Sequence, residues 1–343
     1  MIKIDDIRHL HIEASSLCNA RCPLCPRNVF GYNHNCGYTE TNLELSLVTR
    51  SFSSDFLKQI TTVLINGNFG DFVSNLEIIE ILRYFRQCNP TMVIEISTNA
   101  SARGKRFWQD LGELGNITVG FCLDGIDEDT HQLYRQDTSW SRILQNAQVF
   151  IAAGGTAMWK MIPFDHNRHQ IEDCKALAKE LGFTKFFLTD SGRDSGLAFD
   201  REGNFSHRIG VSEIRFESAR STIDYINSNP RFDLPKHDPN IQPHCETKDR
   251  RSIYIAADGK VYPCCYLGFS PETYKSNWIG FLNKQIAPLV ERNSLYTHTL
   301  EECLTWFNKV ESSWTKDRYE DGRLMQCDAA CGRKKTSYHQ KLP

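Results

Sequence analysis

The chain has 343 residues, of which 40% are hydrophobic and 24% charged, an ordinary balance for one large globular domain or one large and one small domain. A formal net charge of -2 gives no electrostatic support for a general role in binding polyanions. Residues 1–11 lack the apolar core of a secretory signal, and no apolar stretch approaches the roughly 20 residues of a membrane span, so we expect a cytoplasmic protein. Most of its 13 cysteines fall in two clumps near the ends of the chain, which is more typical of metal binding or redox chemistry than of disulfides.

Apolar runs alternate with amphipathic stretches through residues 1–190. Expected strands cover residues 9–14, 61–66, 92–97, 117–123, 157–163 and 183–189. Expected helices cover residues 53–60, 76–87, 105–112, 140–153 and 169–181, and residues 26–50 are expected to be irregular. Strand–helix alternation implies a parallel sheet, and six units suggest a partial TIM-like (β/α)6 barrel in an α/β protein. In such folds the chemistry lies on loops after the C-terminal ends of the strands.

The alternation stops at residue 191. We interpret residues 191–240 as a connector with a helical piece at 211–227. Residues 252–257 and 260–263 flank Asp258-Gly259 and predict a β-hairpin. The sequence therefore predicts three parts: a barrel at 1–190, the connector, and a small α+β domain at 241–343 that carries the second group of cysteines.

Cys18, Cys22 and Cys25 form a C-x3-C-x2-C triplet directly after the first expected strand. Three thiolates at this spacing can each bind one iron of a [4Fe–4S] cubane and leave the fourth iron open for another ligand. A structural zinc site is the alternative, and it needs a fourth ligand such as His34 or Cys36.

Three further motifs follow the triplet at successive strand ends, and with them residues 8–190 resemble the radical S-adenosylmethionine (SAM) superfamily. In that family a glycine-rich loop after the second strand binds the SAM amino group, the third strand often ends in Ser-Thr-Asn, and the fourth commonly reads Ser-x-Asp-Gly before a His and an Arg. The matching residues are Gly67-Asn68-Phe69-Gly70-Asp71, Ser97-Thr98-Asn99, and Cys122-Leu123-Asp124-Gly125 with His131 and Arg135. The resemblance implies a SAM site built from Gly67, Asn68, Gly70, Asp71, Ser97, Asn99 and Asp124. Two departures from the family are Leu24, where an aromatic residue is usual, and Gly-Asn-Phe-Gly-Asp in place of Gly-Gly-Glu.

Taken singly, each motif has a structural explanation. Gly67 and Gly70 suit a tight turn, Asn99 a helix cap, and Asp124-Gly125 an ordinary turn. Their shared placement at strand ends favours the SAM interpretation.

The second group of cysteines resembles the twitch/SPASM extension of radical SAM enzymes. Cys245 and Cys264 lie on either side of the expected hairpin with a C-x13-G-x4-C spacing, and Cys327 and Cys331 form a C-x3-C pair. The resemblance implies that these four hold one auxiliary [4Fe–4S] cluster, as in the shorter twitch form. Cys265 or Cys303 could replace one of them, and a closed zinc site is the alternative.

The resemblance implies reductive cleavage of SAM to a 5′-deoxyadenosyl radical, which abstracts a hydrogen atom from a substrate. Cys122 replaces the usual Ser and shares a strand face with Asp124, so its thiol could return a hydrogen atom to a substrate radical; a buried core cysteine is the alternative. Lys160 could be a general base or an exposed strand-end lysine. Cys36 is a further loose candidate, whereas Cys88 and Cys174 on expected helices are structural.

For the substrate, the resemblance favours a peptide or protein that is crosslinked, epimerised or oxidised, and the alternative is a small molecule of the sugar or aminoglycoside type. Because the triplet starts at residue 18, we expect no N-terminal leader-binding domain. A reductase such as flavodoxin or ferredoxin is the expected electron donor. A non-enzymatic iron–sulfur or zinc protein is a different class that the motifs of the SAM site disfavour. Nucleic acid is disfavoured because no RNA-binding motif is present.

Overall fold

The computed structural model describes residues 2–32, 38–189, 196–210, 216–228, 238, 241–269, 284–290 and 292–332. In this part of the chain eight strands form one sheet in the order β10-β9-β1-β2-β3-β4-β5-β6. Their bounds are β1 (His9–Ile12), β2 (Thr62–Ile65), β3 (Val93–Thr98), β4 (Ile117–Cys122), β5 (Thr156–Met161), β6 (Lys185–Leu188), β9 (Ser252–Ile255) and β10 (Val261–Tyr262). All neighbours are parallel except β10, which pairs antiparallel with β9.

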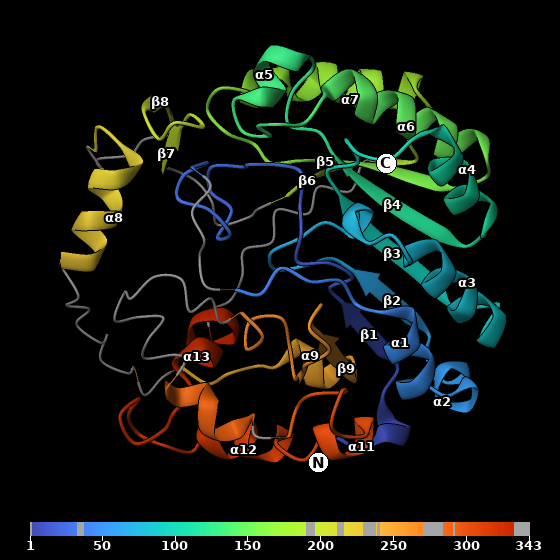
Figure 1. Cartoon of the computed structure of the whole chain (residues 1–343), viewed down its shortest axis with the longest axis vertical. Coiled ribbons are helices and arrows are strands. Elements are labelled where there is room, and N and C mark those ends of the chain that lie inside the picture. The colour runs from blue at the N-terminus through green and yellow to red at the C-terminus, as the bar shows by residue number, and fades with distance from the viewer. Residues whose placement is uncertain are drawn as a thin grey trace.

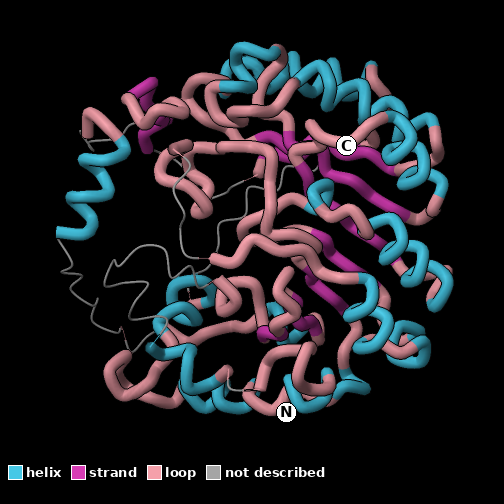
Figure 2. The backbone as a smooth tube through the Cα atoms, viewed as in Figure 1, coloured by secondary structure: helices cyan, strands magenta, loops and turns pink. Residues whose placement is uncertain are grey.

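Helices cover the outer side of this sheet, on the right and at the top of Figure 1. Those between the barrel strands are α1 (Leu45–Ser51), α2 (Ser54–Lys58), α3 (Ile78–Cys88), α4 (Lys105–Glu113), α5 (Glu128–Gln132), α6 (Trp140–Ala152) and α7 (Ile171–Glu180), with 3-10 turns η2 (Phe72–Ser74) and η3 (Arg168–Gln170). Figure 2 shows loops gathered on the opposite side, where the strands end. This arrangement is the one expected of a partial TIM-like barrel.

Alternation along the strands decides which side chains face the helices and which face the inside of the barrel. On β3, Ile94, Ile96 and Thr98 are buried, while Ser97 between them is only half-buried. On β4, Phe121 packs against Trp108 of α4 and Phe150 of α6, so it points outward. Successive strand residues point to opposite faces, so Gly120 and Cys122 point inward.

The predicted α/β fold with a parallel barrel sheet is confirmed, and each of the six expected strands is present. The irregular stretch predicted over residues 26–50 is wrong at its end, because α1 occupies Leu45–Ser51 and buries Leu47 and Val48. The predicted hairpin is present as β9 and β10, and β9 pairs with β1 in the barrel sheet. The predicted domain boundaries at 190 and 240 stay predictions.

The remaining described elements lie beside and below the barrel in Figure 1. They are η1 (Ile4–Asp6), β7 (Gly196–Phe199), β8 (Phe205–Ile209), α8 (Ala219–Ser228), α9 (Glu246–Asp249), η4 (Ala287–Leu289), α11 (Leu300–Cys303), α12 (Phe307–Ser313) and α13 (Met325–Cys331). Of the helical piece predicted at 211–227, residues 211–215 lie outside the described residues. Among the described helices, none combines the length and the apolar character that crossing a membrane requires.

Candidate functional site

The cysteine triplet lies in the loop that leaves β1. Cys22 is buried, Cys18 and Cys25 are half-buried, and all three pack in one small apolar cluster with Tyr134 and Phe164. The Cys18 sulfur accepts a hydrogen bond from the backbone N–H of Ala20 at 3.4 Å. The structure thus brings the three predicted ligands together at the C-terminal edge of the sheet. His34 and Cys36, the alternative zinc ligands, lie outside the described residues.

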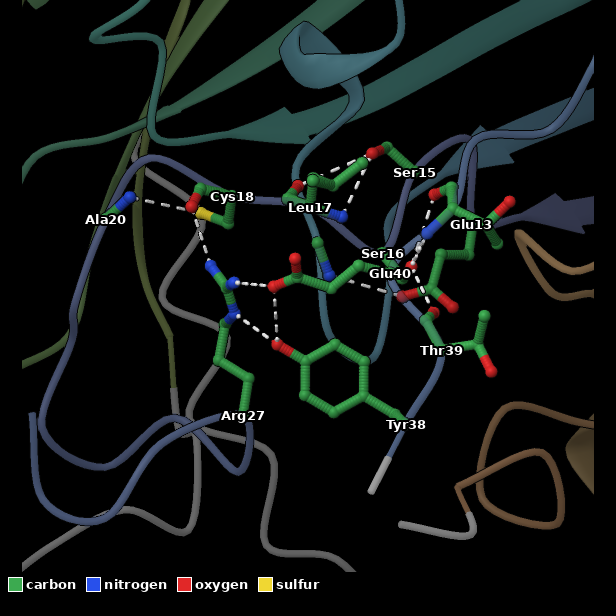
Figure 3. A network of polar contacts seen from close by, with 12 residues as sticks. Glu13, Ser15, Ser16, Leu17, Cys18, Ala20, Arg27, Tyr38, Thr39 and Glu40 are labelled. Atoms are coloured by element: carbon green, nitrogen blue, oxygen red, sulfur yellow. Dashed lines mark hydrogen bonds and ion pairs between the residues drawn. The ribbon is translucent and has the colours of Figure 1, made fainter. Parts of the chain in front are cut away.

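Two arginines flank this loop. The Arg27 guanidinium donates to the Cys18 carbonyl at 2.7 Å and to the Tyr38 hydroxyl at 3.1 Å, and it lies 3.3 Å from Glu40, as Figure 3 shows. Arg135 lies 3.9 Å from the Cys22 sulfur. Both cations interact electrostatically with thiols of the triplet, so they offset the negative charge that three thiolates bring.

The donor set fits an iron–sulfur cluster. Burial raises the pKa of the Cys18 thiol, and the neighbouring Asp71 and Cys22 raise it further. A thiolate is therefore stable at this position only beside a cation, such as an iron of a cluster. No three histidine, cysteine or acidic side chains of the described residues are arranged to hold a single metal ion. Cubane ligands differ in this respect, because each thiolate binds a different iron.

Asp71 fastens the glycine loop to the end of β3. Its carboxylate accepts hydrogen bonds from the Thr98 hydroxyl at 2.7 Å, the Asn99 N–H at 2.7 Å and the Val73 N–H at 3.2 Å. The Asn99 amide in turn donates to the Cys18 sulfur at 3.4 Å and to Asn19 at 3.1 Å. Asp71, Asn99 and the cysteine loop, which the sequence predicts to act together, therefore form one connected network.

Asp124 is fully buried at the end of β4, and both of its oxygens have partners. Arg135 donates to one at 2.6 Å, and the Ile162 N–H donates to the other at 2.6 Å. His131 accepts from the Asp124 N–H at 3.1 Å, and burial lowers its pKa to about 3, so the ring is neutral. Asp124 thus joins β4, β5 and Arg135 to one another.

The two predicted catalytic residues are neighbours across β4 and β5, where Cys122 pairs in register with Lys160. The Lys160 ammonium donates to the Ser97 hydroxyl on β3 at 2.9 Å. Its aliphatic stem crosses Gly120, where an added Cβ would lie 2.4 Å from the Lys160 Cδ. The absent side chain at Gly120 therefore lets Lys160 lie across the inner face and reach Ser97.

A cavity of about 310 Å³ opens beside the triplet. Its lining residues are Cys18, Asn19, Ala20, Arg21, Arg27, Asn28, Asp137 and Arg201. Asp137 forms ion pairs with Arg21 at 2.7 Å and Arg201 at 3.0 Å, so the cavity wall is polar and carries both signs of charge.

The C-terminal cysteines also gather. Burial raises the pKa of Cys264, and the nearby Cys265, Cys327 and Cys245 add to that shift. Burial raises the pKa of Cys327 to about 12, with Cys331 and Cys245 adding to it. The predicted set of four therefore lies close together, with Cys265 beside it. Cys303 is fully buried on α11, where burial and Glu302 raise its pKa to about 12.

Arg323 and Asp328 connect the parts of the chain that carry this group, and neither residue is among those predicted from the sequence. The guanidinium forms two hydrogen bonds to the Asp328 carboxylate, at 2.7 and 2.9 Å, with both side chains 2% exposed. The same guanidinium donates to the Ile241 carbonyl at 2.9 Å, and the His244 N–H donates to the Cys331 carbonyl at 3.3 Å. The segment before Cys245 is thereby tied to α13. The only sequence signal is an Arg five residues before an Asp, which is too common to be informative.

Comparisons with known proteins identify the fold. No protein-family model matches the sequence, and no curated protein matches it. Among solved structures, native anSMEcpe with bound AdoMet (SAM) is similar at a TM-score of 0.53 and 16% identity, over 96% of this chain and 91% of that one. SuiB of Streptococcus suis bound to S-adenosylmethionine is similar at a TM-score of 0.52 and 16% identity, over 94% of this chain and 77% of that one. Native anSMEcpe with bound AdoMet and the Kp18Cys peptide is similar at a TM-score of 0.51 and 15% identity, over 97% of this chain and 92% of that one.

In a further SuiB structure the match spans only 62% of the SuiB chain, less than two thirds of its length. The structural neighbours are radical SAM enzymes. At these identities the likeness shows that this chain has their fold.

Proposed function

We propose that this chain is a radical SAM enzyme that modifies a peptide or protein. The observation that carries the proposal is the network from Asp71 through Asn99 to the Cys18 sulfur, because it joins a predicted SAM loop to a predicted cluster ligand. The shared fold with SAM-bound enzymes supports it. A peptide bound to native anSMEcpe supports the peptide class.

Cys18, Cys22 and Cys25 would hold the first [4Fe–4S] cluster, and Cys245, Cys264, Cys327 and Cys331 the auxiliary one. When bound by these three thiolates, the first cluster would supply the single electron needed for reductive cleavage of SAM to methionine and the 5′-deoxyadenosyl radical, the species that would take a hydrogen atom from the substrate. A flavodoxin or ferredoxin would deliver that electron.

The chain's own residues bind and orient the reactants. Gly67, Asn68, Gly70, Asp71, Ser97, Asn99 and Asp124 form or fix the SAM site. The hydrogen bonds of the buried Asp71 and Asp124 carboxylates fix the strand ends in position, which orients SAM against the substrate. Lys160, held by Ser97, points a cation into the barrel, and Cys122 beside it is the candidate hydrogen-atom donor.

The test is anaerobic reconstitution with iron and sulfide, followed by metal counting and an assay for 5′-deoxyadenosine after reduction with SAM. We expect about 8 iron per chain and product formation. The triple variant Cys18→Ala, Cys22→Ala, Cys25→Ala should keep about 4 iron and lose all cleavage. Cys88→Ala, a half-buried cysteine on α3, is the matched control and should behave as wild type.

Stoichiometric zinc, or iron without cleavage of SAM, would refute the enzyme proposal. For the substrate class, deoxyadenosine formation is compared with the Kp18Cys peptide and with an aminoglycoside added. Stimulation by the aminoglycoside alone would refute the peptide class.

A further inference from the structure

Glu13, the residue after β1, is a buried carboxylate that the predicted site does not include. It is 2% exposed, and its Oε1 accepts from the Phe69 N–H at 2.7 Å and the Gly70 N–H at 3.3 Å. Its Oε2 accepts from the Tyr254 hydroxyl at 3.0 Å. Gly67 leaves room for this carboxylate, since an added Cβ there would lie 2.5 Å from Oε1.

Tyr254, on β9, is the second residue that contacts the glycine loop, and its hydroxyl donates to the Glu13 carboxylate. The Asn68 N–H is also directed toward the Tyr254 hydroxyl oxygen and partly offsets the rise in pKa that burial gives that group. Three consecutive amides, at Asn68, Phe69 and Gly70, therefore point toward the Glu13–Tyr254 pair. In a trans peptide unit the C=O points opposite to the N–H, so the carbonyls of Gly67, Asn68 and Phe69 point away from the pair. Adjacent carbonyl oxygens directed to one side suit an ammonium group.

The described C-terminal residues 241–269, 284–290 and 292–332, here called the C-terminal segment, contact the same loop at two further places. The Asn68 side chain donates to the Cys265 carbonyl at 3.0 Å. The Phe69 ring stacks between Tyr38 and Phe269, with centroid distances of 4.9 and 5.5 Å. The glycine loop thus lies between the first barrel strand and the loop that carries Cys264 and Cys265.

We propose that Glu13 and Tyr254 are positioning residues that turn the carbonyls of residues 67–69 toward the amino group of SAM, so that the C-terminal segment completes the SAM site. This inference rests on the proposed function for the identity of the ligand. It assigns the C-terminal segment a role in binding SAM that is separate from holding a cluster.

The test uses Tyr254→Phe in the full chain, reconstituted anaerobically, with Tyr262→Phe as the matched control. Tyr262 is a buried tyrosine on β10 of the same hairpin. The dissociation constants of SAM, S-adenosylhomocysteine and 5′-methylthioadenosine are measured by equilibrium dialysis. The third ligand lacks the amino acid part. Hydrogen exchange of residues 67–71 is measured separately without ligand.

We expect Tyr254→Phe to raise the dissociation constants of SAM and S-adenosylhomocysteine about 5- to 20-fold and to leave that of 5′-methylthioadenosine within about twofold of wild type. Hydrogen exchange of residues 67–71 should become about tenfold faster. Glu13→Gln should act in the same direction, and the double variant should lose less than the two single losses combined because the residues act as one pair. Iron per chain should not change.

Equal SAM affinity in wild type and Tyr254→Phe would overturn the inference, as would equal weakening by Tyr262→Phe or equal weakening of all three ligands. Failure of the proposed function looks different, because the wild type itself would then bind no SAM.

Discussion

Gly70→Ala tests whether the glycine loop must sit against the cysteine loop. A Cβ on Gly70 would lie 2.0 Å from the Ser15 carbonyl oxygen and 2.6 Å from the carbonyl carbons of Ser15 and Ser16. These are backbone atoms three residues or fewer from Cys18, so no side-chain rotation can relieve the overlap. Both sides are anchored, by hydrogen bonds from the Ser16 N–H to Thr41 and from the Asp71 N–H to Leu17, at 3.0 and 2.8 Å.

The methyl group therefore has to separate the two loops by about 1 Å or more to reach an ordinary contact distance. Overpacking of this kind costs about 1–3 kcal/mol of unfolding free energy. A misplacement of about 1 Å can cost about 10²-fold in function, so we expect SAM affinity to fall by one to two orders of magnitude.

The assay combines thermal unfolding under argon with equilibrium dialysis of SAM against the reconstituted protein. Gly104→Ala is the control, because no atom lies within 4 Å of its added Cβ and its φ of -101° is ordinary for any residue. A melting temperature equal to that of wild type, together with a SAM dissociation constant within twofold of wild type, would refute the expected overlap.

Three further predictions concern the rest of the molecule. Arg323→Met removes the guanidinium that pairs with the buried Asp328 carboxylate, so denaturant unfolding should show a loss of about 3–5 kcal/mol in the free energy of unfolding, whereas Arg318→Met at an exposed ion pair should show none. Burial lowers the pKa of His131 to about 3 in the fold, against 6.5 in the unfolded chain, so the neutral ring favours the folded state fully above pH 6.5. This contribution to the free energy of unfolding is lost as pH falls from 6.5 toward 3, at up to about 1.4 kcal/mol per pH unit, and His131→Asn should therefore flatten the acid side of a pH–stability curve. Burial raises the pKa of Cys327 to about 12, and ligation of iron at the proposed auxiliary site would require its thiolate, so iron retained against a fixed chelator should increase from pH 6.5 to 8.5; a flat profile would contradict this.

The barrel could be predicted from the sequence because each strand is a short apolar, β-branched run between amphipathic helical stretches. The apolar, β-branched run at residues 61–66 contains β2 at Thr62–Ile65, in which Val63 and Ile65 are buried and Thr62 and Leu64 are half-buried. The motifs at strand ends could be found for the same reason, since locating a parallel strand also locates the edge where its loop begins.

Which strands pair with one another could not be predicted in the same way. The pairing of β9 with β1 joins residues about 240 positions apart, and the local pattern of 252–257 shows only that a strand is present. The short helix α1 was also missed, because Glu44 at its start makes no side-chain cap and its seven residues give weak periodicity.

Glu13 is a residue of the site that the sequence does not reveal. An acidic residue directly after a strand is costly to bury unless hydrogen-bond donors satisfy its carboxylate. Its donors are backbone N–H groups 56 and 57 residues away and a tyrosine 241 residues away, which no local pattern reveals. Glu13 is therefore not among the residues predicted from the sequence, and its partners become visible only in the fold.

Buried carboxylates, each with directional donors, fix the relative positions of the loops around this site. The four pairs or groups are Glu13 with Tyr254, Asp71 with Thr98 and Asn99, Asp124 with Arg135, and Asp328 with Arg323. Apolar packing tolerates small slides between elements, whereas a satisfied carboxylate loses its hydrogen bonds as soon as its donors move. Each of these acids joins segments that are distant along the chain or belong to different elements. Removing one partner should therefore loosen the geometry of the site while most of the apolar core remains, and ligand affinity should respond more than melting temperature does.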